Sequence, residues 1–141
     1  MLHTNITVNE KNHLCFGGAD TVELAEKYKT PLYLLDEVRV REKCRVFAQS
    51  FKKYFKEGSM ALVASKALSL KAVYKIAQEE GLGADSVSGG EIYAAKMSGF
   101  NLSNMVFHGN AKSKDELSYA IDENIGFIAV DNLTELDRIS K

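Results

Sequence analysis

The chain is organised around one stretch, Met60-Ala61-Leu62-Val63-Ala64-Ser65-Lys66-Ala67-Leu68-Ser69. Five apolar residues lead into Ser65 and Lys66, and a run that is apolar on both faces is typical of a strand buried inside a parallel sheet. Lys66 then lies at the carboxyl end of the strand, where open α/β sheets and barrels place their chemistry. A partly buried lysine at that end can form a Schiff base, whereas the alternative is a lysine that simply extends into solvent.

Composition excludes several classes of partner. The 141 residues suffice for one modest domain, and 18 basic against 19 acidic residues leave a net charge of -1, which favours neither nucleic acid nor an anionic membrane. No apolar run approaches a membrane-spanning length, and the first residues lack the pattern of a signal peptide. Cys15 and Cys44 have no metal-ligand spacing, so we expect buried thiols, no metal site and a cytoplasmic location.

Two short strands are predicted at the start of the chain, Asn5–Val8 and His13–Phe16, joined as a β-hairpin. Asp20, with Glu23 three residues later, has the pattern of a capping box and predicts a helix through Tyr28.

The next two predicted elements are a short strand, Leu32–Leu35, and the longest helix, from Asp36 to about Lys56. The apolar residues of this helix recur in steps of four and three, which places them on one face and predicts that they belong to the core. They are Val40, Cys44, Phe47, Phe51 and Tyr54.

From residue 60 onward the pattern becomes periodic. Four predicted strands are each followed by a predicted helix, and three of these helices begin with the capping pairs Ser88/Glu91, Ser113/Glu116 and Asn132/Glu135. The strands are Ala61–Ser65, Gly83–Val87, Met105–Phe107 and Phe127–Val130. The strand-to-helix junctions hold Lys66, Asp85, His108 and Asp131, at separations of 19, 23 and 23 residues.

Four consecutive βα units predict an α/β fold with parallel strands, either a barrel or a doubly wound sheet. The barrel is favoured because the units are regular and no Gly-x-Gly-x-x-Gly opens a helix. A (β/α)8 barrel needs eight strands and the sequence shows four, so the chain is predicted to be the first half of a TIM-like barrel from a larger protein.

Junction residues of successive units line one mouth of a barrel, so Lys66, Asp85 and His108 are expected to face a common cavity. An amine, a carboxylate and an imidazole that converge are a typical catalytic set. Asp85 could instead cap the next turn, and His108 could be a strand-end histidine whose hydrogen bonds are satisfied by the backbone. Asp131 is expected to do only local capping.

At these junctions the sequence resembles a known family. The segments Ala61–Ala67, Leu82–Glu91 and Val106–Ser113 look like successive motifs of the diaminopimelate decarboxylases, which belong to the alanine-racemase-like, pyridoxal-phosphate-dependent barrel enzymes. Val-Ser-Gly-Gly-Glu followed by Phe-His-Gly-Asn is the most specific part, and Thr30–Asp36 resembles the entry to that barrel. The resemblance covers roughly residues 13 to 140.

The resemblance implies that Lys66 binds the cofactor, pyridoxal 5'-phosphate, covalently. Asp85 matches an acidic residue near the cofactor and that lysine, and His108 matches a histidine at the barrel mouth. Val63 stands where an aromatic residue is frequent, and Ala111 where a second asparagine is usual. Neither departure removes a group that the reaction requires.

The resemblance further implies decarboxylation of an amino-acid substrate, meso-diaminopimelate, to L-lysine in lysine biosynthesis by a homodimeric full-length enzyme. Residues 1–36 would contribute to a separate β-domain, and residues 37–141 would form the first four βα units of the cofactor-binding barrel. Residues that bind the phosphate, the pyridine nitrogen and the substrate are expected beyond Lys141.

Four alternatives stay open at this point. They are a barrel aldolase with a Schiff-base lysine, a related pyridoxal-phosphate-dependent basic amino-acid decarboxylase, a non-catalytic barrel that carries the cofactor, and a fragment without activity of its own.

Overall fold

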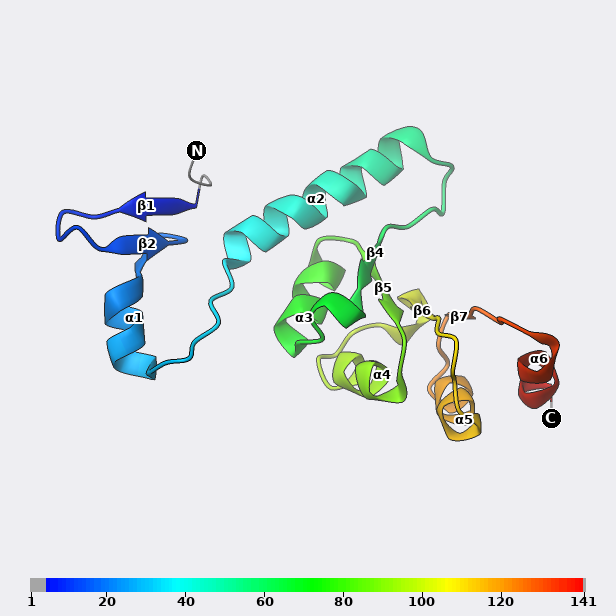
Figure 1. Ribbon diagram of the computed structural model, residues 1–141. Helices are drawn as coiled ribbons and strands as arrows, with labels where there is room; N and C mark the ends of the chain where they lie inside the picture. The colour runs from blue at the N-terminus through cyan, green and yellow to red at the C-terminus, as the bar shows by residue number, and fades with distance from the viewer. Residues whose placement is uncertain (1–4, 141) are drawn as a thin grey trace. The chain divides into compact units, whose positions relative to one another are not determined.

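The computed structural model describes residues 5–140, which fall into two compact units within residues 1–43 and 44–141. The first unit contains a three-stranded antiparallel sheet in the order β1-β2-β3, followed by helix α1 (Thr21–Tyr28) (Figure 1). Its strands are β1 (Ile6–Val8), β2 (Leu14–Phe16) and β3 (Ala19–Asp20). The predicted hairpin is confirmed, because β1 and β2 pair with Val8 opposite Leu14. The sequence did not predict β3.

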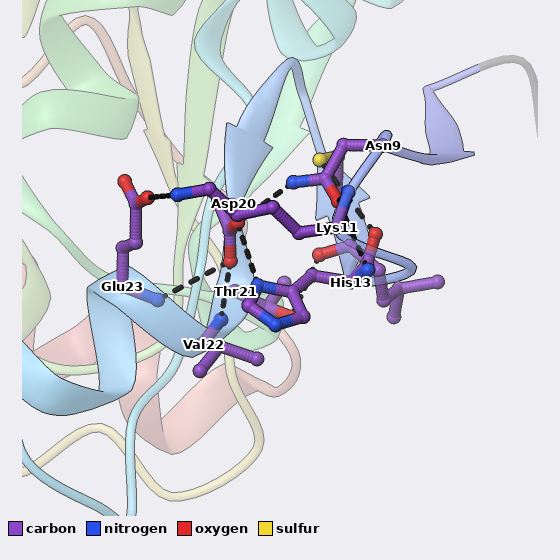
Figure 2. A network of polar contacts seen from close by, with 9 residues as sticks. Asn9, Lys11, His13, Asp20, Thr21, Val22 and Glu23 are labelled. Carbon is purple, nitrogen blue, oxygen red and sulfur yellow. Dashed lines mark hydrogen bonds and ion pairs between the residues drawn. The ribbon is translucent and has the colours of Figure 1, made fainter.

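Asp20 connects this sheet to α1 (Figure 2). Its Oδ1 accepts hydrogen bonds from the backbone N–H groups of Val22 and Glu23, at 2.9 and 3.2 Å, so it caps α1 as predicted. The side chain of Glu23 pairs with Lys11 at 2.8 Å instead of returning to the cap, so the predicted box is only half formed. Cys15 is buried in the sheet, as expected.

The strand predicted at Leu32–Leu35 is wrong: these residues have no regular secondary structure. A strand needs a neighbour to accept its backbone hydrogen bonds, and within residues 5–140 no strand pairs with this segment. All four side chains are exposed, Tyr33 completely so.

Helix α2 (Glu37–Tyr54) confirms the long helix predicted from Asp36 to Lys56. The prediction that its apolar face belongs to the core is confirmed for Cys44 and wrong for Phe47 and Tyr54, while Val40 and Phe51 are half-buried. Cys44 is buried, but Phe47 and Tyr54 are exposed, and Phe51 stacks on Phe55 at 4.5 Å. Periodicity identifies the face that is apolar, but whether that face is covered depends on its neighbours.

The second unit contains a parallel sheet in the order β4-β5-β6-β7, which confirms the four predicted βα units (Figure 1). The strands are β4 (Leu62–Ala64), β5 (Gly83–Ser86), β6 (Met105–Phe107) and β7 (Phe127–Ile128). The helices between and after them are α3 (Lys71–Glu79), α4 (Gly89–Lys96), α5 (Lys114–Asp122) and α6 (Leu133–Ile139). Short 3-10 helices, η1 (Ser65–Ala67) and η2 (Leu102–Asn104), follow β4 and precede β6.

The two faces of this sheet differ. Ala84, Met105 and Phe107 point to one face, where they form a buried core with residues of the helices. The other face carries Ala64, Asp85, Val106 and Phe127, which lie side by side because they are register partners across β4, β5, β6 and β7. Phe127 is 70 % exposed, so within residues 5–140 this second face is partly open.

Strand β4 was predicted to lie inside the sheet, but among the described residues it pairs only with β5, and Leu62 is exposed. Between residues 5 and 140, no helix combines the length and the apolar character needed to cross a bilayer.

Candidate active site

The three candidate residues lie at the carboxyl ends of successive parallel strands. Lys66 is in η1, directly after β4, and its side chain is exposed. Asp85 is the third residue of β5 and points to the open face of the sheet. His108 directly follows β6, and its backbone N–H donates to the Ser86 carbonyl at 2.8 Å. The parallel register therefore places all three at one edge of the sheet.

His108 lies near both of the other two candidate residues. Its Nδ1 lies 4.0 Å from Asp85 Oδ1, which is an electrostatic contact and too long for a hydrogen bond. His108 and Lys66 line the same open hollow of about 380 Å³, together with Val87, Gly109, Asn110, Ala111 and Glu116. Asp85 is not part of that lining. The structure thus pairs His108 with Asp85 and places it in one hollow with Lys66.

A buried hydroxyl precedes the lysine. Ser65 is 2 % exposed, and its Oγ has no hydrogen-bond partner in the described part of the chain. A buried polar group without a partner is unusual in folded proteins. Sequence reasoning missed this residue, although a small polar residue that interrupts an apolar run was its signal.

Glu116 joins the N-terminal ends of α4 and α5 at the hollow. Its Oε1 accepts a hydrogen bond from the Gly89 backbone at 2.9 Å, and its Oε2 accepts from the backbone and the hydroxyl of Ser113 at 3.0 and 2.9 Å. The hydrogen bond from Gly89, followed by those from Ser113, lowers the pKa of Glu116 below its ordinary value. The predicted capping box is confirmed here, but its link to Gly89 was not foreseen.

Asp131 does not cap α6; Asn132 does, by accepting a hydrogen bond from the Glu135 backbone at 2.9 Å. The carboxylate of Asp131 instead lies 3.4 Å from Lys112 Nζ, so the expectation of purely local capping is wrong. Lys112 also contacts Glu135 at 3.0 Å. Within residues 5–140 no cluster of three or more His, Cys, Asp or Glu side chains is placed to hold a metal ion.

Comparison with known proteins identifies the family of this site. Residues 37–141 match the family described as pyridoxal-dependent decarboxylase, pyridoxal binding domain. The chain belongs to this family. The cofactor class implied by the sequence motifs is thereby confirmed.

The relatives of this chain support the narrower resemblance. Diaminopimelate decarboxylase of Bacillus methanolicus is 49% identical over 137 residues, which cover 97% of this chain and 32% of the relative. The Bacillus subtilis enzyme of the same name is 46% identical over a segment that covers 96% of this chain and 30% of that enzyme. The chain therefore spans about a third of the length of the curated relatives it matches.

Solved structures agree with this relationship. A diaminopimelate decarboxylase from M. jannaschii superposes with a TM-score of 0.83 at 32% identity, covering 96% of this chain and 32% of that structure. The same protein in co-complex with L-lysine superposes with a TM-score of 0.85 at 33% identity, covering 99% of this chain and 33% of that structure. A lysine/ornithine decarboxylase from Vibrio vulnificus, at 20% identity and a TM-score of 0.73, shares the fold.

Proposed function

We propose that this chain is the N-terminal third of a pyridoxal-phosphate-dependent enzyme that decarboxylates meso-diaminopimelate to L-lysine. The observation that carries the proposal is the placement of Lys66 and His108 in one hollow, at the ends of successive parallel strands. The identity of 49% with a diaminopimelate decarboxylase over nearly the whole chain supports this substrate over other amino acids. The full-length enzyme is proposed to act as a cytoplasmic homodimer.

We also propose that residues 37–141 are the first half of a (β/α)8 barrel. Two features of the sheet support it over a doubly wound fold. The strands follow one another without a reversal of order, whereas doubly wound sheets change direction at a switch point. The helix-covered core lies on one face, and the open face with Asp85 and Phe127 suits the interior of a barrel. Residues 1–36 are assigned to a separate β-domain.

Lys66 at the hollow and Ser65, which precedes it in the sequence, fit the cofactor. Lys66 offers an exposed amine, and the buried Ser65 hydroxyl next to it is still able to donate or accept a hydrogen bond. The cofactor, when bound, supplies a ring that accepts the electrons released as carbon dioxide leaves the substrate.

The roles of the three residues follow from their chemistry. Lys66 Nζ is the nucleophile that holds the cofactor. The Asp85 carboxylate, 4.0 Å from His108 Nδ1, is proposed to attract cationic groups at the cofactor site. His108, at the edge of the hollow, is proposed to contact the cofactor and orient it.

Substitution of Lys66 tests the proposal in the full-length protein. Lys66→Ala is expected to lower the rate of carbon dioxide release from meso-diaminopimelate by about a thousandfold or more, because the covalent group is lost. The melting temperature should change little, since the side chain is exposed. Lys75→Ala, an exposed lysine on α3, is the matched control and should keep full activity.

The substrate is tested separately. Release of carbon dioxide is measured from meso-diaminopimelate, L-lysine, L-ornithine and L-arginine with the unmodified enzyme. Faster turnover of ornithine or arginine would replace the proposed substrate with that of a related decarboxylase. Substantial activity in Lys66→Ala would overturn the role of the lysine.

A further inference from the structure

A buried ammonium group contacts the loop that carries His108. The side chain of Lys112 is 0% exposed, and the residue immediately precedes Ser113, which caps α5. Its Nζ donates a hydrogen bond to the Gly109 carbonyl and lies 3.0 Å from Glu135 Oε1 and 3.4 Å from Asp131 Oδ2. An ammonium has three N–H donors, and these three oxygens are sufficient to satisfy them.

The partners of Lys112 belong to two consecutive βα units. Gly109 is in the loop after β6, whereas Asp131 and Glu135 lie between β7 and the first turn of α6. The ammonium also lies 5.8 Å from the centre of the Phe107 ring, which is part of the core. Lys112 therefore ties the loop that carries His108 to the next unit of the sheet.

Stability alone does not explain a lysine at this position. Taking an ion pair out of water offsets much of the attraction between its charges, so well-packed apolar side chains of similar size often stabilise a fold equally well. An apolar side chain, however, cannot donate a hydrogen bond to the Gly109 carbonyl. That hydrogen bond is the specific contribution of the ammonium.

The backbone position of Gly109 matters for the hollow. The preceding residue, His108, makes a ladder hydrogen bond through its N–H to Ser86. Gly109 then passes so close to the loop after β5 that a Cβ on it would lie 3.2 Å from the Val87 carbonyl oxygen. Val87 limits movement of the loop in one direction, and the hydrogen bond from Lys112 restrains the carbonyl of Gly109. Val87, His108 and Gly109 all line the hollow with Lys66.

We propose that Lys112 is a positioning residue: through the Gly109 carbonyl it fixes residues 108–111, and with them His108, at the cofactor site. The ligand in this inference rests on the proposed function, whereas the restraint on the loop is a property of the chain itself.

Two variants of the full-length protein separate positioning from stability. Lys112→Met removes the ammonium but leaves the buried Glu135 carboxylate unpaired, so it should lower the melting temperature. Lys112→Met combined with Glu135→Gln removes that charge as well and should recover most of the melting temperature. If Lys112 positions the loop, the double variant still binds pyridoxal 5'-phosphate about tenfold or more weakly and loses kcat/KM by up to about a hundredfold, the effect of a displacement near 1 Å.

A second measurement does not depend on activity. Hydrogen exchange of the backbone amides of residues 108–111 is followed by mass spectrometry in the cofactor-free protein. The double variant should exchange faster in this segment than the unmodified protein, with the core strand β6 unchanged.

Lys96→Met is the matched control. Lys96 pairs with Glu123 at 2.5 Å between the ends of α4 and α5, which in a parallel βα arrangement lie away from the carboxyl ends of the strands. Its cofactor affinity, kcat/KM and exchange in residues 108–111 should match the unmodified protein.

The outcomes distinguish a positioning role of Lys112 from a merely structural one. Cofactor affinity and kcat/KM that return together with the melting temperature in the double variant would show a merely structural role, as would unchanged exchange in residues 108–111. An unmodified enzyme that decarboxylates none of the amino acids offered would refute the proposed function, while cofactor affinity and exchange would still test Lys112. If Lys112→Met does not fold, the double variant with Glu135→Gln provides the test.

Discussion

Asp20 collects four donors on one carboxylate (Figure 2). Beyond the two backbone N–H groups of α1, its Oδ2 accepts from Asn9 Nδ2 at 2.7 Å and faces His13 Nδ1 at 2.9 Å. Burial by itself raises the pKa of Asp20. Hydrogen bonds from His13, the Glu23 backbone and Asn9 outweigh burial and lower the pKa from 3.8 to about 2.

The stability of the first unit should therefore depend on this carboxylate in acid. Because the folded-state pKa lies below the ordinary value, the charged form stabilises the fold fully above pH 3.8, and this contribution is lost as the pH falls towards 2. Asp20→Asn should be less stable than the unmodified protein near neutral pH, and the difference should shrink through that window. This difference in stability is measured by following unfolding through the amide NMR signals of α1 at each pH.

Glu10→Gln is the control for that experiment, since Glu10 is an exposed carboxylate in the same hairpin. Its difference from the unmodified protein should stay near zero throughout. A constant difference for Asp20→Asn from neutral pH to about pH 2 would contradict the assigned effect.

At the scale of elements, neighbouring βα units make backbone contact where the strands begin. A Cβ at Gly126, just before β7, would lie 2.0 Å from the Ser103 carbonyl oxygen in η2. A Cβ at Gly83, the first residue of β5, would lie 2.4 Å from the Asn104 carbonyl oxygen. The amino ends of these strands are therefore packed backbone to backbone, while the carboxyl ends carry the loops of the hollow.

Gly126→Ala should destabilise the second unit by about 1–3 kcal/mol or more, because the backbone of η2 must shift to admit the methyl group. Gly90→Ala is the control: in α4 its Cβ would come no closer than 3.8 Å to Ser88 Oγ, and alanine favours a helix by about 0.5–1 kcal/mol over glycine. Urea unfolding of the full-length protein measures both. Equal stability of the two variants would contradict the close packing at Gly126.

At the scale of the whole molecule, the parallel sheet is unprotected at both edges within residues 5–140. Strand β4 pairs only with β5, and β7 pairs only with β6. Phe127 in β7 and Leu133 in α6 are exposed, and so are Val38, Val46, Phe47 and Tyr54 of α2. Open strand edges favour pairing with other chains.

The 141-residue chain expressed by itself should therefore aggregate or remain partly disordered. It should neither retain pyridoxal 5'-phosphate through gel filtration nor release carbon dioxide from diaminopimelate, since the chain spans only a third of its relatives. Gel filtration with absorbance detection and a thermal melt check both points. A cooperatively melting monomer that keeps its cofactor would contradict the half-barrel proposal.

Within residues 5–140, the sequence by itself determined the order and type of the α-helices and of every strand except β3. Periodicity, capping residues and the regular spacing of the junctions are local signals, so the four βα units and the helix starts at Ser88, Ser113 and Asn132 were correct. Parallel strands with short crossovers have few possible arrangements, which is why Lys66 and His108 could be expected at one edge of the sheet. The resemblance to the family motifs indicated the chemistry of these two residues.

Tertiary structure alone decided which groups are covered and which side chains meet. The segment 32–35 lacks a strand because no strand pairs with it, and Phe47 and Tyr54 on the apolar face of α2 are exposed because the described residues do not cover them. The contacts of Lys112 with Gly109, Asp131 and Glu135 join residues of different units. Burial and pairing depend on neighbours that are distant in sequence, and a pattern read along one chain does not contain their positions.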